Sequence, residues 1–66
     1  MSEAEFKNTL FDFLNNIQDE NLRTRKNIVE FFKDNYSIGK SKVHSHLKFF
    51  IDNSIIIDKN HLIYFV

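Results

Sequence analysis

The chain has 66 residues, no cysteine, no proline and a formal net charge of zero. This length makes one domain, and the lack of cysteine excludes disulfides and thiolate zinc sites and favours a reducing, cytoplasmic location. The longest apolar runs, Ile55–Ile57 and Leu62–Val66, are far too short for a membrane span, and the acidic start MSEAEF is unlike a secretory signal.

Charge is distributed unevenly along the chain. Residues 1–22 have a net charge of −4, residues 23–48 of +5 and residues 49–66 of −1. A basic middle between acidic ends is typical of a surface that faces a polyanion, although a solvated helix face explains the pattern equally well.

The first predicted helix runs from about Glu3 to Gln18. Ser2 and Glu5 form a capping-box pattern at its start. Apolar residues then recur on one face: Phe6, Leu10, Phe13, Leu14 and Ile17. A polar connection follows, in which the side chain of Asp19 or Asn21 can cap the N-terminus of the next helix.

Two further helices are predicted. The second runs from about Leu22 to Asp34, and Asn35 ends it in a left-handed conformation. Its inward-facing residues are Leu22, Ile28, Val29 and Phe32. After the turn 36–39, Gly39 or Ser41 caps the third helix, residues 40–53, whose inward residues are Val43, Leu47, Phe50 and Ile51.

Residues 54–66 change to strand periodicity. Ile55–Ile57 and Leu62–Val66 flank the polar residues 58–61 and predict a β-hairpin. The order of elements predicts a mainly α fold, a single winged helix-turn-helix domain over residues 1–66 with three helices and a two-stranded wing. A second interpretation makes residues 22–34 the first helix of the fold and the N-terminal helix an added dimerisation element.

The segment Ile38–Phe50 carries most of the polar side chains that could have a function. His44 and His46 point roughly 200° apart on a helix, so they cannot bind one metal ion together. Gly39-Lys40-Ser41 ends like a phosphate-binding loop, but Asp34 stands where that motif needs its first glycine. Nothing resembles a nucleophile elbow or a carboxylate pair in an apolar cleft, so we expect no enzyme and no cofactor.

Binding of double-stranded DNA fits this segment best. If the inward residues of the third helix face the core, the opposite face carries Ser41, Lys42, Ser45, Lys48 and Asp52. Its small hydroxyl and long cationic side chains suit a major-groove helix. The candidate DNA-binding residues lie on the second helix, the third helix and the hairpin turn: Arg23, Arg25, Lys26, Lys40, Ser41, Lys42, His44, Ser45, Lys48 and Lys59.

The segment IGKSKVHSHLKFFIDNSIII resembles the recognition-helix region of winged helix-turn-helix transcriptional regulators of the MarR/ArsR-like superfamily. The matching positions are Gly39, Ser41, Val43, His46, Leu47, Phe50, Asn53, Ser54, Ile55 and Ile56. The resemblance implies a regulator of transcription with helix 40–53 in the major groove. Ser45 stands where these regulators often have arginine, and the wing turn is short, so phosphate contacts are expected to dominate affinity. The alternative is a winged-helix module that binds another protein and binds DNA weakly or not at all.

Several aromatic residues lie outside the apolar faces that the predicted helices turn toward the core. These residues are Phe11, Phe31 and Phe49, and the hairpin is in addition apolar on both faces. A symmetric homodimer would cover them, whereas a core widened by Phe11 and Phe31 is the alternative. The sequence indicates no pocket for a small-molecule ligand.

Overall fold

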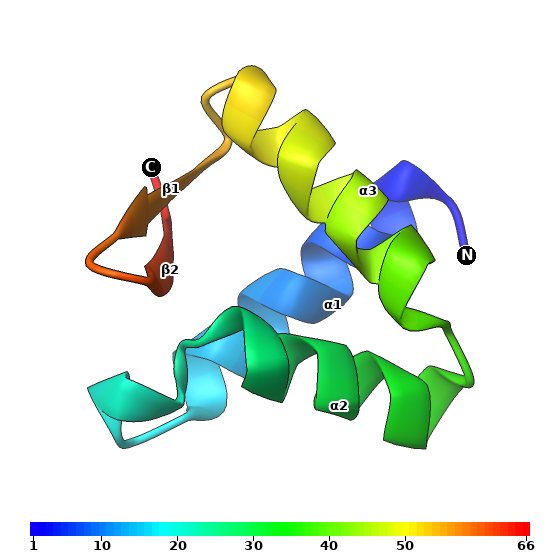
Figure 1. Cartoon of the computed structure of the whole chain (residues 1–66), viewed down its shortest axis with the longest axis horizontal. Helices are drawn as coiled ribbons and strands as arrows, with labels where there is room; N and C mark the ends of the chain where they lie inside the picture. The colour runs from blue at the N-terminus through cyan, green and yellow to red at the C-terminus, as the bar shows by residue number, and fades with distance from the viewer.

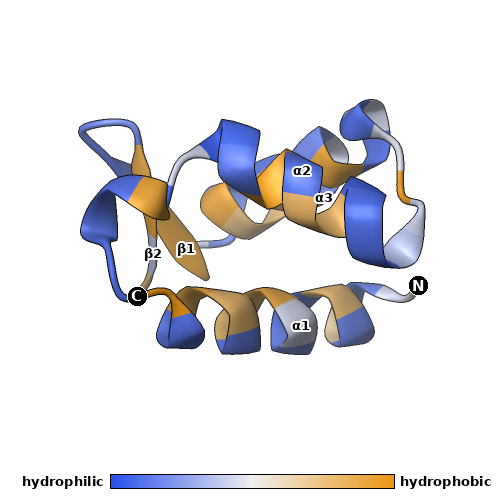
Figure 2. Ribbon diagram, turned by 90° about the horizontal axis from the view of Figure 1, so that it is seen from below, coloured by the Kyte–Doolittle hydropathy of each residue, from blue (hydrophilic) through white to orange (hydrophobic).

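The computed structural model describes all 66 residues and contains three helices followed by a two-stranded hairpin (Figure 1). The elements in chain order are α1 (Glu3–Asn16), the short 3-10 turn η1 (Glu20–Leu22), α2 (Arg25–Tyr36), α3 (Lys40–Asp52), β1 (Ile56–Lys59) and β2 (Leu62–Phe65). In Figure 2, α1 forms one layer and α2 and α3 form the other, with the hairpin at one end. The predicted winged helix-turn-helix fold is confirmed.

The core draws on every helix and both strands. Its ten buried side chains are all apolar: Phe6, Leu10, Leu14, Ile28, Phe32, Val43, Leu47, Phe50, Ile56 and Ile63. Because α1 supplies three of them, the N-terminal helix is an integral part of the fold and not an addition to it.

The start of α1 forms as predicted. The N–H of Glu5 donates to Ser2 Oγ at 3.2 Å, and the N–H of Ser2 donates to Glu5 Oε1 at 3.0 Å, which completes the capping box. The helix ends at Asn16, two residues earlier than Gln18, because Ile17 is already extended.

The predicted start of the second helix at Leu22 is wrong. Residues 20–22 form η1, which Asp19 caps, and α2 begins only at Arg25 with Thr24 as its cap. The cause is a long-range contact with β2: the N–H of Ile63 donates to the carbonyl of Arg23 at 2.9 Å, and Thr24 forms a β-bridge with Leu62. Leu22, expected to face inward, is therefore 45% exposed.

The turn between α2 and α3 also differs in detail. Ser37, with φ of 55°, is the left-handed residue that ends α2, and Asn35 is still helical. Gly39, one of the two predicted caps, is the N-cap of α3, whereas Ser41 is already helical; no side chain caps this helix start.

The hairpin has a tighter turn than expected. Lys59 pairs with Leu62, so only Asn60 and His61 form the turn, with φ of 54° and 67°. Two successive positive φ values are those of a type I′ turn, which matches the twist of a hairpin. Asp58 supports this turn by accepting the N–H of His61 at 3.0 Å.

Arg23 joins α1 to the hairpin. Its Nη2 donates to the carbonyl of Leu14, and its Nη1 donates to the carbonyl of Ile63, both at 3.1 Å. The guanidinium also lies 4.6 Å from the centre of the Tyr64 ring, whose hydroxyl donates to the carboxylate of Glu20.

We predict that Arg23→Met lowers the free energy of unfolding by about 2 kcal/mol, because two partly buried carbonyls lose a charged donor. Urea denaturation measures this change. Arg25→Met is the control: Arg25 pairs with Asp58 in a partly exposed ion pair, whose loss should cost less than about 1 kcal/mol. Equal losses for the two variants would contradict the structural role of Arg23.

Candidate nucleic-acid interface

Helix α3 presents a polar face opposite its buried face. Val43, Leu47 and Phe50 are buried, as predicted, and Ile51 is half-buried. The polar residues on the solvent side, all exposed, are Ser41, Lys42, Ser45, Lys48 and Asp52, and Lys40 is exposed at the start of the helix. The structure therefore brings four of the ten candidate residues together on one helix surface.

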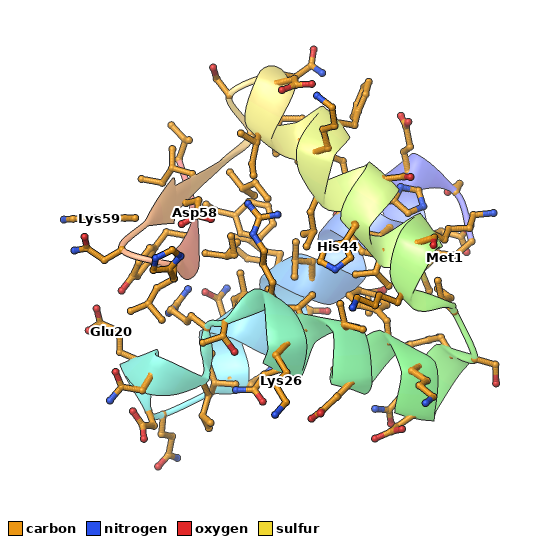
Figure 3. All side chains as sticks on the ribbon, viewed as in Figure 1. Met1, Glu20, Lys26, His44, Asp58 and Lys59 are labelled. Carbon is orange, nitrogen blue, oxygen red and sulfur yellow. The ribbon has the colours of Figure 1, made fainter.

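The two histidines of α3 lie on its opposite flanks. The His46 ring stacks on Phe6, with ring centres 4.3 Å apart, so it faces α1. Figure 3 shows His44 on the flank of α3 that faces α2. Partial burial lowers the pKa of His46, while the nearby carboxylate of Glu3 acts in the opposite direction.

The two arginines among the candidates already have partners within the fold. Arg23 is bound to main-chain carbonyls, as described above. Arg25 donates from Nε and Nη2 to Asp58 Oδ2 at 3.2 and 2.9 Å, which ties the start of α2 to the hairpin. A phosphate would have to replace these contacts to recruit either side chain.

The remaining lysines are more accessible. Lys48 pairs with Asp52 at 2.9 Å, but both side chains are mostly exposed, so this pair contributes little and a phosphate can compete with it. Figure 3 places Lys26 on the outer side of α2 and Lys59 at the tip of the hairpin. Both are exposed and lie on elements other than α3.

Two shallow hollows adjoin α3 and reveal residues that sequence reasoning missed. The first joins Lys33 to Lys40 beside the α2–α3 turn, where the N-terminus of α3 lacks a side-chain cap. Free N–H groups there favour an anion. The second places Glu3 beside Ser41, Lys42 and Ser45. The sequence gives no sign of this approach, because it depends on how α1 packs against α3.

Two other features are absent from the structure, a metal-binding cluster and a membrane-spanning helix. No three histidine, aspartate or glutamate side chains come together in a group that could hold a metal ion. None of the helices combines the length and the apolar character that crossing a membrane requires.

We predict that His46 makes the stability of the protein depend on pH. Its pKa is lowered in the fold, so the fold favours the neutral ring, and stability falls as pH drops from neutral through the unfolded-state pKa of 6.5. Glu3, Lys42 and the N-terminus are the charged groups that act on this ring. Urea denaturation between pH 8 and pH 5 should show the wild type losing stability relative to His46→Gln as the pH falls. Parallel curves would contradict the assignment.

The comparisons with known proteins add no relative. Neither a protein-family model, nor a curated protein, nor a solved structure matches this chain. The resemblance to MarR/ArsR-like regulators therefore stays a prediction that rests on the sequence of residues 38–57 alone.

Proposed function

We propose that this protein is a small DNA-binding protein that regulates transcription, with α3 in the major groove of double-stranded DNA. The observation that carries the proposal is the surface of α3. This helix exposes three lysines and two serines and has no carboxylate before Asp52 in its last turn. Such a helix, presented by a helix-turn-helix pair with a hairpin beside it, fits the major groove in shape and charge.

Contacts with the phosphate backbone would come from both sides of α3. Lys33 and Lys40 flank the uncapped N-terminus of α3, and Lys26 and Lys59 are exposed on α2 and at the end of β1. Because each neutralised phosphate releases counterions, this arrangement predicts binding that weakens steeply with salt. A cytoplasmic location belongs to the same proposal.

Discrimination between base sequences should be modest. The residues that α3 offers to base edges are Ser41, His44, Ser45 and the neighbouring lysines, and none of them is an arginine. A bidentate contact from arginine to guanine is the commonest specific contact in the major groove. We therefore propose that specific and non-specific affinities lie close together.

A homodimer is the second part of the proposal. Phe11 of α1 packs edge-on against Phe65 of β2, with ring centres 5.2 Å apart, yet Phe11 remains 47% exposed. Val66, which follows Phe65, is 79% exposed, although its N–H is bound to the carbonyl of Ile55. A second copy would cover this apolar patch and give a two-fold pair of α3 helices.

The alternative is a winged-helix module that binds a protein. Glu3 favours it, because a carboxylate beside Ser41 and Lys42 repels phosphates but can pair with a basic group of a protein partner. In that case duplex DNA would bind weakly or not at all.

We predict that the double variant Lys42→Ala/Lys48→Ala weakens binding to duplex DNA and lowers the slope of log K against log salt by about 2, one for each lost phosphate contact. Fluorescence anisotropy at about 50 and about 200 mM salt measures both quantities. Lys7→Ala, an exposed lysine on α1, is the matched control and should change neither. Absence of salt-sensitive binding in the wild type, or an unaffected double variant, would favour the protein-binding alternative.

We predict that light scattering coupled to gel filtration gives the wild type twice the chain mass of 7.9 kDa. Phe11→Glu and Val66→Glu should each give the monomer mass, because a charge in the dimer contact costs several kcal/mol to bury. Leu22→Glu, an exposed apolar residue of η1, is the control and should remain dimeric. A monomeric wild type would remove the dimer from the proposal.

A further inference from the structure

A groove between α1 and α2 has no part in the proposed DNA interface. It has a volume of about 290 Å³, near the lower end of the range for small-molecule sites. Its lining combines three aromatic rings with a carboxylate, an amide and an aliphatic side chain: Phe13, Phe31, Tyr36, Asp12, Asn16 and Ile17. Figure 2 views the molecule from the side on which α1 and α2 run beside each other.

The aromatic rings in this groove are only partly used by the core. Phe13 and Phe31 stack with ring centres 4.3 Å apart, and both are half-buried against the core. Tyr36 lies edge-on to Phe31 at 5.9 Å and is 46% exposed. The groove therefore offers aromatic surface to a ligand, and the negative faces of aromatic rings attract cations.

The charge of the groove has the same sign as those ring faces. Asp12 is exposed on its rim, and its carboxylate makes no hydrogen bond or ion pair with the rest of the chain. No lysine, arginine or histidine lines the groove. The residues of α1 at helical spacing from Asp12 are Asn8, Thr9, Asn15 and Asn16, which add no positive charge.

We propose that this groove binds an organic cation, an ammonium group that carries an apolar body. The positive charge lies beside the Asp12 carboxylate and against the ring of Tyr36, while the apolar body contacts Phe13 and Phe31. An anion would meet an unpaired carboxylate, and a neutral apolar molecule would leave that carboxylate without a partner. The inference does not depend on DNA binding, because none of these residues belongs to the proposed interface.

The site adjoins the helix-turn-helix pair. Tyr36 is the last residue of α2, and the left-handed Ser37 follows it on the way into α3. A ligand held by Tyr36 thus contacts the segment that connects the two helices, at a distance from the exposed face of α3.

The test is an NMR titration of the full chain with benzyltrimethylammonium, with benzyl alcohol as the neutral probe and benzenesulfonate as the anionic probe. The cation should give saturable shifts at the residues that line the groove, and the other two probes should not. Asp12→Asn and Tyr36→Leu should each weaken binding about fivefold, the usual size of one exposed contact between a cation and an aromatic ring or carboxylate. Both residues are exposed, and neither is one of the ten buried core residues.

Two matched variants serve as controls. Glu30→Gln removes the same charge from α2 outside the groove, and Phe49→Leu removes an exposed aromatic ring from α3. Neither should change the affinity for the cation.

The source of the cation is tested with a trimethyllysine amide. If the amide binds more tightly than benzyltrimethylammonium, the ligand is identified as a modified protein side chain. If the amide binds more weakly, the ligand is identified as a free amphiphilic amine. Both outcomes support the proposed cation site. Equal binding of benzyl alcohol, shifts outside the groove, or unchanged affinity in Asp12→Asn and Tyr36→Leu would overturn it.

Discussion

The stacking of Phe6 between α2 and α3 is the interaction on which the rest of this structure depends. Its ring lies 4.0 Å from Phe32 and 4.3 Å from His46, and Phe50 packs at an angle 5.9 Å away. These separations are at or just below those usual for stacked aromatic pairs, and one side chain of α1 thereby joins both other helices. Since His46 must face Phe6, the rotation of α3 about its axis is fixed. The outward direction of Ser41 and its neighbours is thus a consequence of core packing.

The parts of the fold that follow from local physics were predictable from the sequence. The capping box at Ser2 and the buried stripe of α3 depend on spacing along the chain, and both are confirmed. The start of α2 was not predictable in this way, because β2, some forty residues further on, binds Arg23 and holds it outside the helix. The same distinction applies to the candidate site. The exposed face of α3 follows from periodicity, whereas the approach of Glu3 to that face is set by tertiary contacts alone.

The two layers of the molecule differ in charge. Helix α1 carries three carboxylates and one lysine, whereas α3 carries three lysines and one carboxylate. Packing the helices in separate layers directs most of these charges to different surfaces, which leaves α3 free to meet a polyanion. Glu3 is the exception, because it lines the same hollow as Ser41 and Lys42. A phosphate approaching that end of α3 meets both a lysine and a carboxylate, so net attraction should be strongest on the α2 side, near Lys33 and Lys40.

Arginine and lysine have different roles in this structure, and the difference affects what α3 can recognise. The chain has two arginines, and both are bound within the fold, Arg23 by carbonyls and Arg25 by Asp58. Arginine can bind two acceptors in a fixed geometry, whereas lysine is a flexible point charge, so the side chains left at the surface suit phosphates better than base edges. Asp58 adds a constraint, because it holds both Arg25 and the N–H of His61. A phosphate that captured Arg25 would therefore remove one of the contacts that hold the hairpin to the start of α2, and any affinity gained there would be offset by a less firmly held wing.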